Sequence, residues 1–478
     1  MHRPLALALP LLAVVVPATA QDLDWPALER EAVALTSTYL QIDTTNPPGN
    51  ELRGAAFFRA LFEEAGIESR VFESAPGRGN LVARIAGDGS KPSVVLMHHM
   101  DVVPADARFW QREPLSGAIV EGEVWGRGAL DTKTSGIVHA MALLALARGG
   151  MVPRGDVVFL GVADEEAGGE MGAGFMVEQH FELFANAGVV LNEGGWIVAD
   201  DAGAPRYYAV ESAQKTPHWL RLTAKGPPGH GSTPLADAAP DRLVAALGRI
   251  LAWQTPIRVL PEVQRFHADT AHLARDRSER AKLADLRTAL EDPAFREAFL
   301  ANPRQNAQLR NTLSLTALSG SNKTNVIPPE ASAELDVRLL PDEDPEAFLA
   351  ALHGVIDDES IGIETLLAFP PASSPTDHEL FDVLRELSAT HHGAVPVTTP
   401  LAVGFTDCHF FRERGIPCYG FTPFVVGESL VKTVHGNDER ISVENVKRGT
   451  RLTYEIVKRL AGAEPLDPVS ANVARAER

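Results

Sequence analysis

The sequence predicts an α/β fold in which a mostly parallel sheet is interrupted by a smaller α+β domain. From about Trp25 to Gly195, helical stretches alternate with short, β-branched apolar runs, a pattern typical of a layered α/β domain. After Lys215 the pattern changes to an alternating strand and a turn-rich loop, and the α/β pattern returns from about Pro371. The second domain is therefore expected to be inserted into the first.

Three apolar runs in the first domain predict buried strands, and each is followed by charged or metal-binding residue types. The runs are residues 93–97, 156–163 and 188–191, which are followed respectively by His99 and Asp101, by Asp164, Glu165 and Glu166, and by Asn192 and Glu193. Ligands of open α/β sheets bind just outside the carboxyl ends of the strands, so a site is expected there.

The inserted domain, called the lid below, has its own predicted sheet and helices. Strands are expected over residues 218–223, 312–316 and 333–338, helices over 241–253 and 345–355, and further helices in the charged segment 261–310. Helices over 378–390 and 443–460 belong to the first domain again. The expected organisation is catalytic domain 21–216 and 371–462, with the lid at 217–370.

Composition narrows the class of function. The 478 residues carry 44 Lys+Arg against 63 Asp+Glu, a formal net charge of −19, and 45% are hydrophobic. This hydrophobic content excludes disorder as the main state, and the acidic balance without a basic run removes the usual electrostatic driver of nucleic-acid binding. Two cysteines, Cys408 and Cys418, are too few for a disulfide scaffold. The sequence leaves two interpretations open: the two cysteines form a disulfide with each other, or both are free thiols buried in the core.

The two ends of the chain have their own interpretation. Residues 1–20 combine Arg3, an apolar run and a small-x-small site, which predicts a signal peptide cleaved before Gln21. The run is shorter than the roughly 20 residues that span a bilayer, and we expect an exported periplasmic or secreted protein without a membrane span. Residues 463–478 lack periodicity and are expected to be disordered.

Histidine and carboxylate residues after the first strand favour a metal site. Residues two apart in an extended segment share a face, so His99 and Asp101 can cooperate, with His99 on a metal and Asp101 orienting its ring. His98 then points elsewhere, as a hydrogen-bonded neighbour in the sheet. Asp131, in a glycine-rich turn before an apolar helix, has two readings: a helix N-cap or a bridge between two metal ions.

Asp164, Glu165 and Glu166 form a run of adjacent carboxylates that repel one another unless cations or protons relieve them. Two neighbouring glutamates allow one to be a ligand and the other a general base. Glu193 and His435 are the remaining candidate ligands. Nitrogen and oxygen donors without thiolate suit zinc, with cobalt or manganese as alternatives, and a shared ligand implies two ions and amide hydrolysis by metal-activated water.

These motifs, in this order, resemble the co-catalytic zinc exopeptidase family of aminoacylase-1, glutamate carboxypeptidase, carnosinase and succinyl-diaminopimelate desuccinylase. The resemblance rests on His99-x-Asp101, Gly-Ala-Leu-Asp131-x-Lys133, Asp164-Glu165-Glu166-x-Gly-Gly, Glu193 and a late His435. It implies an α/β catalytic domain with an inserted lid that forms a homodimer. It also implies hydrolysis of a peptide or N-acyl amino acid with a free carboxylate.

The resemblance assigns roles residue by residue. Asp131 bridges two zinc ions, His99 and Glu193 complete one coordination sphere, and Glu166 and His435 complete the other. Glu165 is the general base and Asp101 the orienting carboxylate. In the lid, His230 of Gly229-His230-Gly231-Ser232 helps hold the oxyanion, often across the dimer interface. Asn325 and Arg338 grip the substrate carboxylate, to which a planar guanidinium is suited.

The sequence departs from the family pattern in two places. The substrate-binding loop, expected to use Gly404 and Thr406, reads Val403-Gly404-Phe405-Thr406-Asp407 and carries a bulky Phe405. The segment 261–310 lengthens the lid, which is similar to the carboxypeptidase S and N-acyl amino acid hydrolase branch. Both departures bear on the substrate rather than on the metal centre.

Three other functions fit the sequence less well. A zinc aminopeptidase predicts an acidic patch for the substrate ammonium and no lid arginine, whereas Asn325 and Arg338 indicate carboxylate capture. A non-catalytic periplasmic binding protein is free to lose its base and ligands, yet all are present. A serine hydrolase needs a Gly-x-Ser-x-Gly elbow, which does not occur in the chain.

Overall fold

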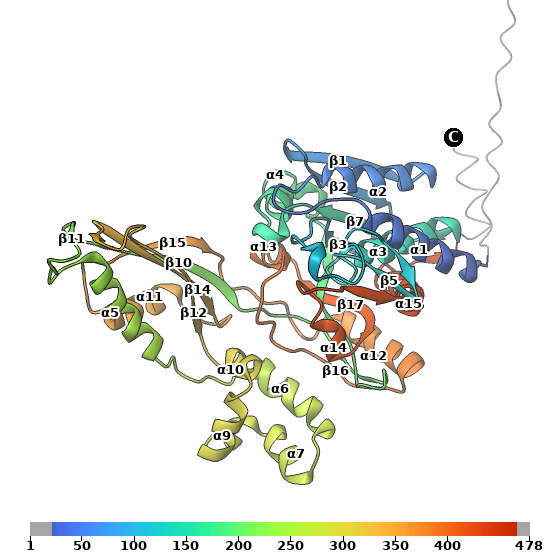
Figure 1. Ribbon diagram of the computed structural model, residues 1–478. Coiled ribbons are helices and arrows are strands. Elements are labelled where there is room, and N and C mark those ends of the chain that lie inside the picture. Colours follow the sequence, from blue (N-terminus) through green and yellow to red (C-terminus); the bar gives the residue numbers. More distant parts are fainter. Residues whose placement is uncertain (1–21, 466–478) are drawn as a thin grey trace, which may run out of the picture.

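The computed structural model describes residues 22–465, and its centre is an eight-stranded mixed sheet (Figure 1). The strand order is β1-β2-β7-β3-β8-β9-β16, with β17 paired to β8 as well. The pairs β3–β7, β3–β8, β8–β17 and β9–β16 are parallel, which confirms the predicted α/β class with a mostly parallel sheet. The strands are β1 (Glu68–Ala75), β2 (Arg78–Ile85), β3 (Ser93–His99), β7 (Val157–Val162), β8 (Ala187–Ala199), β9 (Pro205–Ala209), β16 (Val397–Thr398) and β17 (Cys418–Val426).

Helices cover both faces of this sheet because its central strands are apolar on both sides. Along β3, Val94 and Leu96 join one core cluster, and Val95 and Met97 join the other. The first cluster lies under α1 (Trp25–Leu40), α2 (Leu52–Glu64), α3 (Lys133–Arg148), α12 (Glu379–His392) and α15 (Val443–Leu460). The second lies under α4 (Phe175–Gln179) and α13 (Cys408–Glu413).

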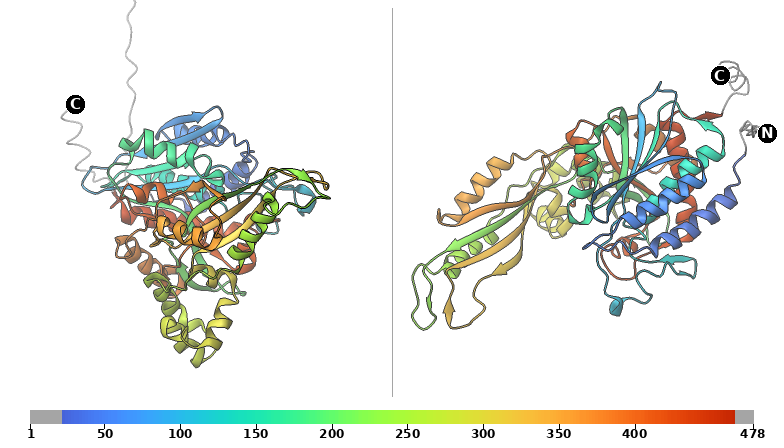
Figure 2. Two further views of the ribbon diagram at one scale, coloured as in Figure 1. Left: turned by 90° about the vertical axis from the view of Figure 1, so that its left-hand side faces the viewer. Right: turned by 90° about the horizontal axis from the view of Figure 1, so that it is seen from above.

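The lid is built on a separate four-stranded antiparallel sheet that projects from the first body (Figures 1 and 2). Its order is β12-β14-β10-β15, and two helices share its core. The elements are β10 (Thr216–Lys225), β12 (Thr312–Ser319), β14 (Glu330–Leu339), β15 (Gly362–Ala368), α5 (Ala239–Ala252) and α11 (Pro345–Ile356). A short ladder of β11 (Gly229–His230) with β13 (Val326–Ile327) lies at its far end.

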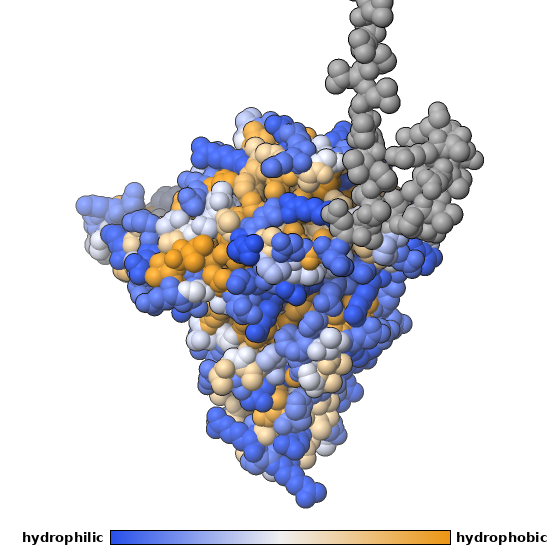
Figure 3. Space-filling model, turned by 90° about the vertical axis from the view of Figure 1, so that its right-hand side faces the viewer, coloured by the Kyte–Doolittle hydropathy of each residue, from blue (hydrophilic) through white to orange (hydrophobic). Residues whose placement is uncertain are grey.

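Five short helices, called the helical extension below, leave the lid between α5 and β12. They are α6 (Pro261–Thr270), α7 (Arg277–Ala284), α8 (Leu286–Ala289), α9 (Pro293–Leu300) and α10 (Pro303–Gln308). Their apolar core includes Leu401 and Ala213 of the segments near the first sheet, so the extension is anchored there. Its outer end, at the bottom of Figure 3, is mainly hydrophilic on the face shown.

Minor elements complete the described chain. They are β4 (Ile119–Val120), β5 (Glu123–Trp125), β18 (Arg440–Ser442), β6 (Met151–Val152), β19 (Glu464–Pro465) and α14 (Glu428–Val431). The predicted signal peptide and most of the predicted tail lie outside the described residues. Glu464 and Pro465 pair with Val152 and Met151, an ordered start that the prediction did not include.

Two further findings concern the whole of residues 22–465. A disulfide joins Cys408, at the start of α13, to Cys418, at the start of β17, and so resolves the two readings of these cysteines. Within this range, none of the helices combines the length and the apolar character that crossing a bilayer requires.

Candidate metal centre

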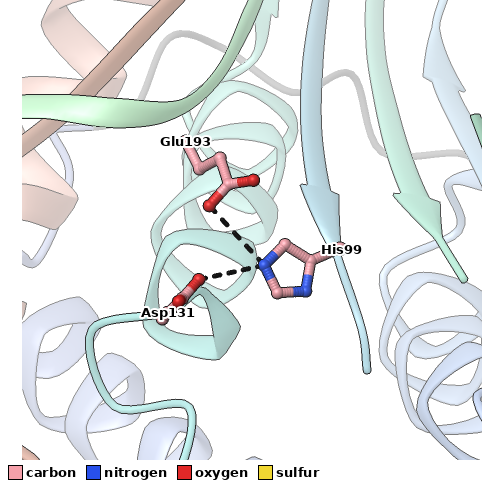
Figure 4. A group of neighbouring side chains, drawn as sticks. All are labelled: His99, Asp131 and Glu193. Carbon is pink, nitrogen blue, oxygen red and sulfur yellow. Dashed lines mark hydrogen bonds and ion pairs between the residues drawn. The ribbon is translucent and has the colours of Figure 1, made fainter. Parts of the chain in front are cut away.

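Two groups of side chains share the carboxylate of Asp131. His99, Asp131 and Glu193 form one, and Asp131, Glu166 and His435 form the other; within each, the facing ligand atoms lie within 4.8 Å of one another. His99 Nε2 is 3.0 Å from Asp131 Oδ1 and 3.6 Å from Glu193 Oε2 (Figure 4). His435 Nε2 is 3.0 Å from Asp131 Oδ2 and 3.1 Å from Glu166 Oε2. The two oxygens of Asp131 therefore face different groups.

Parallel strands bring most of these residues to one edge of the sheet. His99 ends β3, Glu193 lies in the neighbouring β8, and Glu166 follows β7 in a short turn. Asp131 precedes α3, and His435 follows α14 with a left-handed backbone, φ 57°. The five residues that the sequence singled out as ligands are thus gathered beside the carboxyl ends of β3 and β7, and Glu193 reaches them from within β8, which runs on to Ala199 instead of ending before Glu193 as expected.

The orientation of His99 comes from main chain as well as from side chain. Its Nδ1 is 2.9 Å from the main-chain oxygen of Asp101 and 3.5 Å from Asp101 Oδ1. A carbonyl oxygen only accepts, so Nδ1 carries the proton and Nε2 faces the carboxylates. The carbonyl of Asp101 makes the shorter of the two contacts, and its carboxylate, the expected orienting group, lies against the same nitrogen.

The Asp101 carboxylate also holds the loop that carries the two glutamates. It accepts the N–H groups of Glu165 and Glu166, both at 3.2 Å, and the Asn46 side chain at 2.8 Å. Asn46 also lies 3.3 Å from Asp164 Oδ1, an oxygen that Arg78 contacts as well. Sequence reasoning missed Asn46 and Arg78, since neither lies in a motif.

The Asp131 turn is held by Glu439, a third residue that sequence reasoning did not single out. This buried carboxylate accepts N–H groups from Gly128 at 3.1 Å, Leu130 at 2.7 Å and Asp131 at 3.1 Å. It also pairs with Arg127 at 2.7 Å. Its only sequence signal was its place four residues after His435.

The crowding of carboxylates shifts their protonation. Burial raises the pKa of Glu193 to about 7, although the charge of His99 opposes the rise. Burial also raises the pKa of Glu165 well above its usual value, and the negative charge of Glu193 adds to this. Hydrogen bonds to Asp131 and Glu166 raise the pKa of His435 to about 10. Cations would relieve this repulsion between carboxylates.

The donor set fits divalent metal ions. Each group offers one imidazole nitrogen and two carboxylates, and the facing atoms converge. Mixed nitrogen and oxygen donors without thiolate suit zinc, cobalt or manganese. His98 lies apart from both groups: it is buried, and its Nε2 is 3.4 Å from the Tyr39 hydroxyl, as expected of a neighbour in the sheet.

Arg338 and the loop around Phe405 meet where the lid joins the first domain. Asp336 accepts from Arg338 Nε at 2.6 Å and from Nη2 at 3.1 Å, and the guanidinium lies 5.1 Å from the Phe405 ring centre. Buried Nη1 has no partner among residues 22–465. In the same loop Thr406 bonds to Gln214, and Gly404 faces open space.

His230 and Asn325 lie elsewhere. They sit in and beside the short β11–β13 ladder at the far end of the lid, well away from the metal groups within one chain (Figure 1). His230 is exposed, and its Nδ1 accepts from the Ser232 main-chain N–H at 3.1 Å. A single chain therefore does not bring these two residues to the metal groups.

Asp407 is a further buried carboxylate near the site that the sequence analysis quoted without a role. Its Oδ2 has no hydrogen-bond partner among the described residues. Burial raises its pKa well above the usual value, and the negative charge of Glu193 adds to the rise. Its position after Gly404-Phe405-Thr406 was the available signal.

Comparison with known proteins places this geometry in a family. Residues 95–459 match the model described as Peptidase family M20/M25/M40. The chain is 31% identical over 372 residues to the N-fatty-acyl-amino acid synthase/hydrolase PM20D1 of Xenopus tropicalis, covering 76% of this chain and 72% of the relative. It is 28% identical over 455 residues to human aminoacylase-1, covering 92% and 98%.

Solved structures share the fold. The M20 family metallo-carboxypeptidase Sso-CP2 from Sulfolobus solfataricus has a TM-score of 0.69 at 18% identity, with 90% of this chain and 99% of that one covered. The YXEP protein of Bacillus subtilis, described as a dinuclear metal binding peptidase from the M20 family, has a TM-score of 0.55 at 16% identity, covering 91% and 99%.

Proposed function

We propose that this protein cleaves the amide bond of an N-acyl amino acid with a free carboxylate. The chain belongs to peptidase family M20/M25/M40, whose metal-dependent hydrolases act on peptides or N-acyl amino acids. The observation that carries the proposal is the pair of ligand groups that share Asp131, with Glu165 preceding the ligand Glu166 in the chain. Short peptides with a free carboxylate are the second substrate class.

The residues divide into ligands and a base. His99 and Glu193 would hold one ion, His435 and Glu166 the other, and Asp131 both; zinc is the proposed metal. When bound, such a pair polarises the scissile carbonyl and makes water a better nucleophile. Glu165 takes the proton of the attacking water on its carboxylate, holds it, and gives it to the leaving nitrogen, so that acid and amine are released. Burial raises the pKa of Glu165 and so makes its carboxylate a stronger base, and cations held beside it would favour the deprotonated form before water attacks.

Substrate recognition is assigned to the lid and the loop beside it. Arg338 is fixed by Asp336, and its remaining Nη1 is free of other described partners, which supports a contact with the substrate carboxylate. Gly404 and Thr406 lie in the adjoining loop. The names of the two relatives, an aminoacylase and an N-fatty-acyl-amino acid synthase/hydrolase, favour an N-acyl amino acid over a dipeptide.

Assembly and location are part of the proposal. His230 and Asn325, at the far end of the lid, would act on the site of a second copy, with a homodimer formed through the lid. Residues 1–20 would direct export to the periplasm or beyond. The disulfide between Cys408 and Cys418 supports this, because such bonds persist mainly in oxidising compartments.

The test is hydrolysis by the mature protein after chelation and resupply of zinc, cobalt or manganese. The panel contains N-acyl amino acids, dipeptides and the corresponding C-terminal carboxamides. The proposal expects metal-restored cleavage of substrates with a free carboxylate. A preference for substrates with a free amine would instead favour the alternative function of a zinc aminopeptidase. Binding of two ions without any cleavage would favour a non-catalytic binding protein.

A further inference from the structure

The loop that carries Glu165 and Glu166 has a backbone that only outside contacts can maintain. Asp164, Gly168 and Gly169 are all left-handed, with φ angles of 71°, 115° and 78°. Glycine adopts this conformation readily, whereas an aspartate does so at a cost and keeps it where its surroundings hold it. The proposed base and the proposed ligand directly follow this aspartate, so the contacts that hold Asp164 bear on both of them.

Both carboxylate oxygens of Asp164 have partners outside the run of three adjacent carboxylates. Oδ1 lies 2.5 Å from Arg78 Nη2 and accepts from the Asn46 side chain at 3.3 Å. Oδ2 accepts the main-chain N–H of Met171 at 3.1 Å. Among residues 22–465, Arg78 is the only ion-pair partner of Asp164. A guanidinium therefore relieves the repulsion within the run at its first member.

The guanidinium of Arg78 serves two carboxylates. Its Nη2 lies 2.9 Å from Glu51 Oε1 as well as 2.5 Å from Asp164 Oδ1, and its Nη1 donates to the carbonyl of Pro48 at 2.8 Å. The side chain of Glu51 is 0% exposed and that of Arg78 is 12% exposed. Because a buried charge needs a partner, Glu51 and Asp164 together fix where the guanidinium lies.

The turn before α2 leaves room for this guanidinium. Gly49 is left-handed, with φ 101°, and a Cβ atom at this position would lie 2.5 Å from Arg78 Nη1 and 2.8 Å from Glu51 Oε2. A side chain at residue 49 would therefore push the guanidinium out of its place. The close approach of this turn to Arg78 depends on the glycine.

Two contacts fix the start of the glutamate loop, and Asn46 connects them. The Asp101 carboxylate accepts the main-chain N–H groups of the two glutamates, both at 3.2 Å, and Arg78 holds the side chain of Asp164. Asn46 donates to Asp101 at 2.8 Å and lies 3.3 Å from Asp164. The directions in which the two glutamate side chains leave the main chain therefore depend on both contacts.

We propose, on the basis of the function proposed above, that Arg78 is a positioning residue for the metal centre. By keeping Asp164 in its left-handed conformation, it holds Glu166 as a ligand for the ion shared with His435 and Glu165 as the base. The partners of Arg78 are Glu51, Asp164, Asn46 and Pro48, none of which is a proposed ligand. Arg78 therefore acts through the loop.

Zinc titration of the metal-free protein tests this. Native protein and Arg78→Met are titrated calorimetrically in the presence of a competing chelator, with His435→Gln as the reference for loss of the ion at Glu166. Arg78→Met is expected to weaken binding of this ion roughly 10- to 10²-fold, the usual effect of removing a group that supports a ligand, and to leave the affinity of the ion at His99 within about threefold.

Kinetics at saturating zinc give a second readout. For an N-acyl amino acid, kcat of Arg78→Met is expected to fall roughly tenfold or more while KM stays within about threefold. The reason for this split is that the loop carries the base, whereas the substrate carboxylate is assigned to Arg338. A variant that had only lost stability would not separate kcat from KM or one ion from the other.

Arg84→Met is the matched control. Arg84 lies at the other end of the same strand β2 and pairs at 2.5 Å with Asp156, which directly precedes β7. Its removal takes an ion pair of the same kind from the same pair of strands without touching the glutamate loop. Chemical denaturation reports the stability of both variants, and the control is expected to bind both ions as the native protein does.

Asp164→Asn keeps the test decisive if Arg78→Met does not fold. Asparagine has the same size, tolerates the left-handed backbone, and leaves Arg78 paired with Glu51. The charged contact between Asp164 and Arg78 is then replaced by a weaker neutral one, so binding of the ion at Glu166 should weaken roughly threefold to tenfold.

Equal weakening of both ions in Arg78→Met, equal effects of Arg78→Met and Arg84→Met, or native affinity for the ion at Glu166 in Asp164→Asn would each overturn the inference. The failure of the proposed function looks different. Absence of amide cleavage by the native protein would refute that function, whereas the zinc affinities of the variants would still decide the role of Arg78.

Discussion

The carboxylate of Glu439 accepts the main-chain N–H of Asp131 at 3.1 Å, across 308 residues of sequence. The same carboxylate follows His435 by four residues, so one loop carries a proposed ligand and also holds the turn of the proposed bridging ligand. This contact therefore links the loop that carries His435 to the turn that carries Asp131.

Removal of this anchor is expected to loosen both metal groups. Glu439→Ala leaves the N–H groups of Gly128, Leu130 and Asp131 without their acceptor and Arg127 without its partner. The loss of stability is expected to be on the order of 3 kcal/mol or more, together with reduced metal content. Chemical denaturation and metal analysis check this, with Glu444→Ala, an exposed residue of α15, as the control. Full metal content in Glu439→Ala would contradict the coupling.

Metal binding is expected to release protons at pH 7. The pKa of His435 is raised to about 10 and that of Glu193 to about 7, so at pH 7 His435 carries a proton and Glu193 carries one in about half of the molecules, and a metal must displace these protons. Apparent affinity should therefore rise as the pH increases from 7 towards 10. In the metal-free protein the stabilisation from His435 is complete below its ordinary pKa of about 6.5 and is lost as the pH rises through about 10.

Calorimetry of zinc binding in two buffers with different ionisation enthalpies measures the protons released. His435→Gln should release fewer protons than the native protein. Equal heats in both buffers for the native protein would show that the site is already deprotonated.

Arg338 is expected to discriminate substrates with a carboxylate from their carboxamides. Arg338→Ala should raise KM for carboxylate substrates by roughly 10- to 10²-fold, the scale of a lost charged hydrogen bond, with a smaller change in kcat. Arg338→Lys should recover little, because lysine lacks the planar fork. Arg221→Ala, which removes a half-buried arginine of β10 paired with Glu334 and Glu364, serves as the control. Unchanged discrimination in Arg338→Ala would assign the carboxylate contact to another residue.

The far position of His230 predicts complementation between chains. Glu165→Gln and His230→Ala should each be inactive or nearly so, and a mixture allowed to exchange subunits should regain activity, because a mixed dimer contains one intact site. Light scattering checks the oligomeric state of each variant. Activity of His230→Ala equal to that of the native protein would rule out the proposed role of His230.

The sequence predicted most of what depends on local pattern. Apolar runs followed by His99, Glu166 and Glu193 implied that these side chains meet, because neighbouring parallel strands end at the same edge. They do meet, although β8 extends beyond Glu193 to Ala199. The helices predicted over 443–460 and 345–355 match α15 and α11 closely. The family match, assigned from motif order, is confirmed.

What the sequence did not reveal depends on contacts between distant segments. Asn46 and Arg78 reach the Asp164 loop from another part of the chain, and no local pattern marks them. The separation of His230 from the metal groups follows from the length and direction of the lid strands, which residue periodicity does not encode. The ordered pairing of Glu464 with Val152 was missed because a two-residue strand has no periodicity to detect.

The most direct test of the central claim compares native protein and Glu165→Gln, each stripped of metal and resupplied with zinc, for bound metal and for hydrolysis of an N-acyl amino acid. The account predicts two ions per chain in both proteins and a loss of turnover of at least about 10²-fold in the variant. Turnover by Glu165→Gln at the native rate, or fewer than two ions in the native protein, would contradict it.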